Sequence, residues 1–392
     1  MAKIALCGIT TNKNFSKNGE AKMVAKISAE LRRQGHIIDR FDVTDNINMS
    51  FGISKLVYDK NYAYKEYLRT LRKFDPDICL TFTDFDSSSI VAAKEIGAKT
   101  VLFYNMHNLV CPLWNALDWK SDYCHTPGIA RCLLHTVMAY NNQHITGPMN
   151  QVSGRMFNLI KLASYFGNYK ISKLADLYIV PSKGMFNELI SFGINRKNIS
   201  LIRYGIDISE WKPSRTKPKN KNILFYSFPS PEKGVNYFIE LAKRFYDDGK
   251  NNLKFIMLKS SHKDIPPNVT QVEWINEQDK LIKLVQSAYA VIVPSVWEDP
   301  SPLVCVESMA AGKPVIGFDV MGLREQIVDK KTGFIVKKGD LEMLYLKIKE
   351  LAEDENLANT MGIAGRKRVI EYFNSSKTHE KYSETINKLI KS

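Results

Sequence analysis

Residues 293–336 read VPSVWEDPSPLVCVESMAAGKPVIGFDVMGLREQIVDKKTGFIV, and they alternate apolar runs with proline and glycine boundaries. The run AVIVPS at 290–295 predicts a buried strand, and residues 303–311 predict a helix that begins after Pro300–Pro302. The next apolar run, PVIGF at 314–318, predicts another strand. A strand, helix and strand in this order form a parallel, right-handed crossover, which indicates an α/β fold.

The start of this helix combines free backbone donors with acidic side chains. Its first N–H groups and its dipole point at whatever precedes residue 303, and this arrangement favours a diphosphate. Asp299 and Glu307 bracket seven residues, with Glu298 beside the first of them. Glu307 lies about one helical turn in, on the side of the same cavity. The backbone predicted to line the ligand is that of Ser301, Pro302 and Leu303, although Pro302 offers no N–H.

Several short motifs in this segment recur in a fixed order. The acidic pair Asp299 and Glu307 is followed by AAGKPV, by Gly322 and Glu325, and by Thr332-Gly333. In this order the segment closely resembles the nucleotide-diphosphate-sugar site of the retaining glycosyltransferases of family 4, which have the GT-B fold. The resemblance extends over nearly the whole chain and implies two Rossmann-like, doubly wound domains that face a cleft.

The resemblance implies a role for each acidic residue. Asp299 would hold hydroxyls of the transferred sugar, and Glu307 would hold the ribose hydroxyls. A carboxylate accepts hydrogen bonds from two adjacent hydroxyls, which suits both tasks. Family members have Glu where this chain has Asp299, so Glu298 is an alternative sugar ligand.

Lys233 follows the first predicted strand of the second half, ILFYSF, within the motif SPEKG. A cation at the carboxyl end of that strand would neutralise a departing diphosphate, and the family has a lysine in this place. The family also has an arginine where this chain has Phe228. Arg203 is the candidate for a replacement cation.

The N-terminal half has the same alternation of strands and helices. Residues 3–8 predict a first strand, and a helix is predicted from Glu20 after Asn18 and Gly19. Gly19 would let the backbone approach a bound phosphate, as in a phosphate-binding loop. His107 ends a later strand, and the resemblance implies that it contacts the transferred sugar; a hydrogen-bonded structural histidine is the alternative.

The two halves are separated by the polar, proline-bearing segment SEWKPSRTKPKNK. We therefore predict an N-terminal, acceptor-side domain over 1–208, a linker over 209–221 and a nucleotide-sugar domain over 222–374. In the second domain, QVEWI at 271–275 predicts a short strand. The resemblance implies that a final helix, 375–392, returns to the first domain.

The composition of the chain indicates which classes of binding partner to expect. The chain has 392 residues and a net charge of +14 at pH 7, which favours anionic partners. No nucleic-acid-binding motif is present, so a nucleotide sugar and an anionic membrane surface are the expected anions. The basic, aromatic stretch at 157–173, with Trp114 and Trp119, is either such a surface or core packing. The absence of a run of about 18 apolar residues or a signal-peptide core predicts a cytoplasmic location, either free or membrane-peripheral.

Two groups of residues suggest metal, and in both a simpler interpretation is favoured. Asp84-Phe85-Asp86 resembles a metal-binding Asp-x-Asp motif, but it precedes a helical run, so helix capping explains it. The cysteines and histidines near residues 107–135 lack the paired short spacing of structural zinc sites. Their members are His107, Cys111, Cys124, His125, Cys132 and His135. We expect no metal and no cofactor, and buried free thiols at Cys7, Cys79 and Cys305.

Together these features predict a metal-independent, retaining hexosyltransferase that moves a sugar from a nucleotide diphosphate to an acceptor hydroxyl. The acceptor would be a glycan or a lipid-linked sugar in glycan, glycolipid or cell-surface polysaccharide synthesis. An epimerase or hydrolase of the same fold and a non-catalytic nucleotide-binding scaffold are the alternatives. An oxidoreductase is disfavoured because no G-x-G-x-x-G motif follows the first strand.

Overall fold

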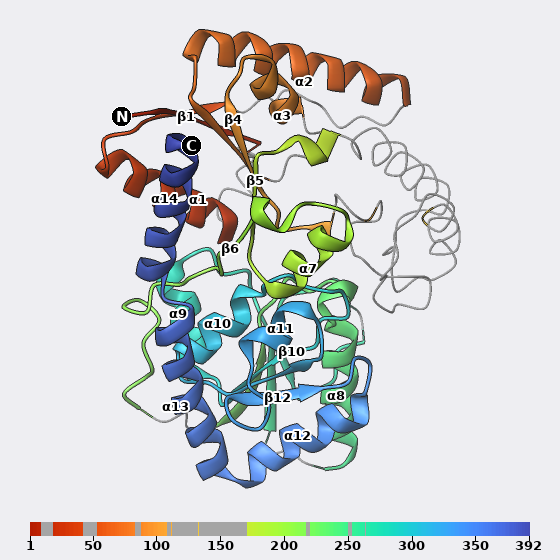
Figure 1. Ribbon diagram of the computed structural model, residues 1–392. Helices are drawn as coiled ribbons and strands as arrows, with labels where there is room; N and C mark the ends of the chain where they lie inside the picture. Colours follow the sequence, from red (N-terminus) through yellow and green to blue (C-terminus); the bar gives the residue numbers. More distant parts are fainter. Residues whose placement is uncertain are drawn as a thin grey trace. The chain divides into compact units, whose positions relative to one another are not determined.

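The computed structural model describes residues 1–8, 19–41, 53–82, 88–107, 111, 132, 171–216, 220–249, 253–262 and 264–392. The chain forms two compact units: unit 1 is Met1–Arg203 with Thr378–Ser392, and unit 2 is Tyr204–Lys377 (Figure 1). Residues 209–216, the first part of the predicted linker, therefore lie within unit 2, where Trp211 is buried.

Unit 1 contains a six-stranded parallel sheet in the order β2-β1-β3-β4-β5-β6. Its strands are short apolar runs, and β3 is buried along its whole length, as expected for a parallel sheet covered on both faces. The strands are β1 Lys3–Cys7, β2 Ile37–Phe41, β3 Ile78–Phe82, β4 Lys99–Phe103, β5 Leu177–Val180 and β6 Ile199–Leu201. The helices are α1 Gly19–Arg33, α2 Ile53–Phe74, α3 Ser88–Glu95, η4 Ile171–Leu174, α7 Lys183–Ser191, η5 Arg196–Asn198 and α14 Ser375–Lys391.

The C-terminal helix α14 packs on unit 1 beside α1 (Figure 1). Tyr382 is fully buried there and donates a hydrogen bond to the Ile202 carbonyl at 3.3 Å. Gln34, just after α1, donates to Ser383 Oγ at 3.1 Å and accepts from Asn387 at 2.8 Å. The C-terminal residues of the chain therefore complete the core of unit 1.

Unit 2 contains a second six-stranded parallel sheet, in the order β12-β11-β10-β7-β8-β9. Helices α8 and α12 pack together, as do α10 and α13 (Figure 1). The strands are β7 Lys221–Phe225, β8 Leu253–Leu258, β9 Val269–Val272, β10 Ala290–Val293, β11 Val315–Phe318 and β12 Gly333–Val336. The helices are η6 Pro231–Lys233, α8 Val235–Asp247, α9 Gln278–Ser287, α10 Leu303–Ala310, α11 Met321–Gln326, α12 Leu341–Glu353 and α13 Glu355–Tyr372.

The α/β class and the two Rossmann-like parallel sheets confirm the predicted fold class. One strand differs from its prediction, because the strand expected at 271–275 forms at Val269–Val272 instead. Its register is set by pairing with β8, from Phe255 opposite Val269 to Leu258 opposite Val272. Beyond that point β8 has ended, so Trp274 lies outside the sheet and is 53% exposed.

The described cysteines are buried, as predicted for Cys7, Cys79 and Cys305. Cys111 and Cys132 are also buried. Other predictions lie outside the described residues. They concern Asn18, Asp84, Asp86, Trp114, Trp119, Cys124, His125, His135 and residues 157–170.

Candidate active site

The strand order of unit 2 reverses between β7 and β10, which are hydrogen-bonded neighbours. Ligands of doubly wound sheets bind beyond the carboxyl ends of the strands at such a switch point. The loops that follow β7 and β10 meet there. Gly234 has φ +82°, and a Cβ on it would lie 1.8 Å from the Pro294 carbonyl oxygen, so this approach requires glycine.

Lys233 and Asp299, which are 66 residues apart, are joined at this point. The Lys233 Nζ donates to Asp299 Oδ2 at 2.5 Å and lies 4.7 Å from the centre of the Trp297 ring. The Asp299 carboxylate is buried, whereas about a quarter of the Lys233 side chain is exposed. The structure therefore places a partly accessible cation beside a buried carboxylate at the switch point.

Glu298, the alternative sugar ligand, is bound to the protein itself. Its Oε2 accepts the backbone N–H of Met321 at 2.9 Å, at the start of α11, and its Oε1 lies 3.5 Å from Lys338 Nζ. A carboxylate at a helix start satisfies a backbone donor that the helix leaves open. These contacts favour a supporting role for Glu298 and leave Asp299 as the acid beside Lys233.

The start of α10 is open, as the sequence predicted. Pro302 precedes the helix and provides no side-chain cap. Among the described residues, no hydrogen bond is made by the backbone N–H groups of Leu303 and Val304. Ser301 Oγ accepts from Gln326 Nε2 at 3.2 Å, which fixes the loop before the helix. Two donors thus remain at the helix start without an acceptor in the described part of the chain.

Gly322 holds the two loops of the site together. Its N–H donates to the Asp299 carbonyl at 2.8 Å. A Cβ at Gly322 would lie 2.6 Å from Pro302 Cδ and 2.7 Å from the Asp299 carbonyl oxygen. No larger residue fits without moving the backbone that carries Asp299 and Pro302.

Glu307 lies on α10, next to a tyrosine that the sequence analysis did not identify. Tyr226, directly after β7, donates to the Val304 carbonyl at 2.8 Å, and its hydroxyl lies 3.4 Å from Glu307 Oε2. Burial raises the pKa of Tyr226 well above its ordinary value, so the residue stays a neutral hydroxyl. A polar side chain immediately after a buried strand was the signal that could have found it.

Phe228 does not pack into the core. It is 65% exposed, and its ring meets that of Trp274 edge-to-face at 6.0 Å. Trp274 follows β9 and Phe228 follows β7, so both lie beyond the carboxyl ends of strands in this sheet. Arg203 is the last residue of the first segment of unit 1.

Of the two candidate residues of unit 1, Gly19 lies at a helix start, whereas His107 follows β4, which ends at Phe103, and is not its last residue as predicted. Gly19 begins α1. His107 is completely buried, and its Nδ1 lies 2.8 Å from Glu188 Oε2. Glu188, on α7, also accepts a hydrogen bond from the Tyr104 hydroxyl. A carboxylate opposite Nδ1 places a proton on that nitrogen and fixes the ring, which directs Nε2 to the other side.

Glu188 was missed by the sequence analysis because it lies 81 residues from His107, on α7. An acidic residue between apolar neighbours in FNELI was the available signal. No group of three or more His, Cys, Asp or Glu able to hold a metal ion occurs within the described part of the chain. Among the described helices, none is long and apolar enough to cross a bilayer.

Comparison with known proteins finds similar glycosyltransferases. Residues 207–368 match the family model of glycosyl transferases group 1. The α-maltose-1-phosphate synthase of Mycolicibacterium smegmatis is 27% identical over 263 residues, which cover 57% of this chain and 68% of that protein. The capsular polysaccharide biosynthesis glycosyltransferase CapM of Staphylococcus aureus is 25% identical over 270 residues, 61% of this chain and 70% of CapM.

A solved structure shares the fold over the whole length. The Anabaena protein HepE, crystallised with UDP-glucose, has a TM-score of 0.66 and 15% identity, and the match covers 99% of this chain and 100% of HepE. The fold is the GT-B architecture, and the family model and the relatives support a glycosyltransferase that uses nucleotide-sugar donors. The predicted resemblance to the group 1 glycosyltransferases is confirmed.

Proposed function

We propose that this protein is a retaining, metal-independent hexosyltransferase that transfers a sugar from a nucleotide diphosphate to a hydroxyl of a glycan or lipid-linked acceptor. The observation that carries the proposal is the Lys233–Asp299 pair beside the open start of α10. Cation, carboxylate and unbonded N–H groups meet at the switch point of the sheet, where a nucleotide sugar requires all three.

The positive and negative groups of this site would bind different parts of the nucleotide sugar. The Lys233 ammonium and the N–H groups of Leu303 and Val304 would stabilise the negative charge that develops on the departing diphosphate. Asp299 would accept hydrogen bonds from sugar hydroxyls, and Glu307 from the ribose hydroxyls. Lys233 would supply the positive charge that other glycosyltransferases take from a metal ion.

The reaction that fits this arrangement occurs on one face of the sugar. The acceptor oxygen forms a bond to the anomeric carbon as the bond from that carbon to the diphosphate oxygen breaks. The acceptor proton passes to the departing phosphate, so no covalent enzyme intermediate is required. His107 in unit 1, held by Glu188, would orient the transferred sugar.

The names of the relatives support a hexose and a glycan product. HepE was solved with UDP-glucose, and CapM is a capsular polysaccharide glycosyltransferase. The net charge of +14 supports attachment to an anionic membrane surface, where a lipid-linked acceptor would lie. Neither the base nor the sugar follows from the site, because fold does not specify them.

The donor can be found by thermal stabilisation with a panel of nucleotide sugars, since a ligand of the folded state raises the unfolding temperature. With that donor and a glycan acceptor, proton NMR of the product should show the anomeric configuration of the donor, and chelator should not reduce the rate. An inverted product would contradict the retaining mechanism. Free sugar released without acceptor would indicate a hydrolase, and binding without turnover would indicate a scaffold.

A further inference from the structure

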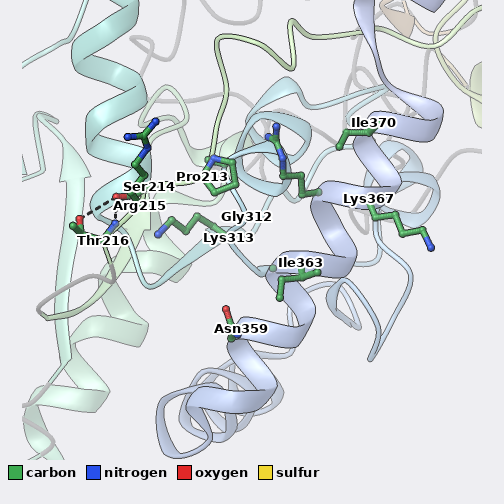
Figure 2. A pocket seen from close by; sticks show the side chains of 13 residues that line it. Pro213, Ser214, Arg215, Thr216, Gly312, Lys313, Asn359, Ile363, Lys367 and Ile370 are labelled. Carbon is green, nitrogen blue, oxygen red and sulfur yellow. Dashed lines mark hydrogen bonds between the residues drawn. The ribbon is translucent and has the colours of Figure 1, made fainter.

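A pocket of about 420 Å³ lies in unit 2 at the C-terminal end of α10 (Figure 2). Three segments line it: residues 213–216, the turn 311–313 after α10, and one face of α13 from Asn359 to Ile370. Its volume is within the range of small-molecule sites, roughly 300–1,000 Å³. The start of α10, where the donor site lies, is at the other end of this eight-residue helix, about 12 Å away.

The charges of this pocket have one sign. Four of its thirteen lining residues are cations, namely Arg215, Lys313, Arg366 and Lys367, and none is acidic. Arg366 is occupied by backbone carbonyls: it donates to Trp211 at 2.6 Å, to Ala310, and to Ile208 at 3.4 Å. Arg215 and Lys367 differ from Arg366, because both are exposed at the rim of the pocket.

Lys313 is the unusual member. Its side chain lines the pocket from the turn after α10 (Figure 2), yet the residue is only 7% exposed. Within the described residues its amine makes no hydrogen bond and no ion pair. Burial lowers the pKa of Lys313 to about 8. Lysines that are mostly buried normally have a partner for the amine, since removing a charge from water is costly.

Helix capping does not account for this lysine. The last carbonyls of α10 attract cations, but Arg366 already donates to Ala310 there. The Lys313 backbone N–H donates to Ser308 at 2.9 Å, so the backbone alone closes the helix. The turn is fixed by close packing, because a Cβ at Gly362 would lie 2.1 Å from the Gly312 carbonyl oxygen. The amine therefore remains available to a ligand.

We propose that this pocket is a second ligand site that binds the phosphate group of a small soluble molecule, with Lys313 as its buried contact. Arg215 and Lys367 at the rim supply further positive charge, and Ser214 and Thr216 supply hydroxyl groups. A membrane phosphate does not fit as well, because a bilayer reaches the exposed Ile363 and Ile370, whereas Lys313 as a residue is only 7% exposed. This inference goes beyond the proposed glycosyl transfer.

The first experiment uses inorganic phosphate as the probe and the reactivity of Lys313 as the readout. Lysines of the whole protein are reductively methylated at constant ionic strength, with phosphate or chloride, and the modified peptides are measured by mass spectrometry. Phosphate should slow modification of Lys313 several-fold and leave that of the exposed Lys254, on β8, unchanged. Equal rates for Lys313 in phosphate and chloride would overturn the proposal.

The second experiment separates this pocket from the donor site, which also attracts phosphate. Calorimetric titrations with inorganic phosphate are made on Lys233→Ala, and on the same variant with Lys313→Met, Arg215→Ala or Lys254→Ala added. Phosphate binding should persist in Lys233→Ala and in its Lys254→Ala derivative, and should weaken at least several-fold when Lys313 or Arg215 is replaced. Arg215 is exposed, so its replacement leaves folding intact.

Two results would overturn the assignment. Loss of phosphate binding in Lys233→Ala alone would place the anion in the donor site. Sedimentation with phosphatidylglycerol vesicles that depends on Ile363 and Lys367, without protection of Lys313 by phosphate, would make this face a membrane surface. Nucleotide-sugar transfer is measured separately, so failure here leaves the proposed function untouched.

Discussion

Two lysines of unit 2 lie at opposite ends of α10 and differ in what surrounds them. Lys233, near the start of the helix, is partly exposed and joined to Asp299 at 2.5 Å. Lys313, after its end, is more deeply buried and has no partner for its amine among the described residues. In the Lys233–Asp299 pair, the carboxylate neutralises the cation in the absence of a ligand. Lys313 shows that a residue can be mostly buried without being part of the hydrophobic core.

Replacing Lys233 should have the largest effect of this comparison. Lys233→Ala removes the cation that would stabilise the departing diphosphate, and we expect turnover to fall by about 10²-fold or more. Lys313→Met should leave turnover within about twofold, because Lys313 lies at the other end of the helix. Steady-state rates with the donor found by the screen measure both, and circular dichroism controls for folding. Normal turnover of Lys233→Ala would remove that residue from the site.

Glu307→Gln tests the acid at the same end of α10. The substitution keeps the shape of the side chain but removes the charge that would accept the ribose hydroxyls. A hydrogen bond to a charged group is worth about 1.5–3 kcal/mol, so kcat/KM should fall roughly 10- to 10²-fold. We expect a large part of the loss in KM for the nucleotide sugar. Glu342→Gln, on α12 away from α10, is the control; equal losses in both variants would contradict the assignment.

Phe228→Arg asks whether the donor end of α10 lacks a second cation. An arginine supplies a planar set of donors to phosphate oxygens, which phenylalanine cannot. If the charge is missing, nucleoside diphosphate binding should tighten by about 1–2 kcal/mol in calorimetric titration. Because Phe228 is 65% exposed, the substitution disturbs little of the core.

The controls for this prediction are Trp274→Ala and Arg203→Ala. Trp274→Ala removes the ring that contacts Phe228 without adding charge, so a gain in that variant would indicate an effect of the aromatic pair instead. If Arg203 already fills the role of the missing arginine, Arg203→Ala should weaken binding, and Phe228→Arg should restore it. Unchanged affinity in both single variants would place residue 228 away from the diphosphate.

Sequence patterns predicted the parts of this molecule that depend on nearby residues. Buried parallel strands are continuous apolar runs, so β10 and β11 were found from AVIV and PVIGF. The strand β9 was misplaced because its register depends on where β8 begins and ends, not on the apolar letters of QVEWI. Pairing with a distant strand overrides local propensity.

The sites also differ in whether they depend on nearby or on distant residues. Asp299, Glu307 and the open start of α10 lie within nine residues of one another, and together with the motifs that follow them in order they predicted a ligand site. The contact of Glu188 with His107 joins residues 81 positions apart. Lys313 stands in AAGKPV, where a lysine after a helix predicts a solvated turn, and its burial comes from residues 213–216 and from α13. No local pattern contains that information.

The smallest expected effect concerns the stability cost of the unpaired lysine. Lys313→Met keeps the length of the side chain and removes an amine whose charged form is disfavoured by burial, so we expect the free energy of unfolding to rise by about 1 kcal/mol at neutral pH, the low end for a polar group without a partner. The midpoint of urea unfolding measures this. Lys254→Met, at an exposed position on β8, is the matched control and should change the midpoint little.

The stability difference between the wild type and Lys313→Met should depend on pH in a defined direction. In the folded protein the pKa of Lys313 is lowered from 10.5 to about 8, so between these pH values the unfolded chain binds the proton more tightly. Stability of the wild type should therefore rise through that window relative to the methionine variant, and the advantage of Lys313→Met should be full below about pH 8 and fade toward pH 10.5. The other charged groups that line the pocket, Arg215, Arg366 and Lys367, are all cations, and burial is the cause of the lowered pKa of Lys313. A difference between wild type and variant that stays constant across this window would mean that the amine is solvated, and that the lysine at this end of α10 is as ordinary as its exposed neighbours.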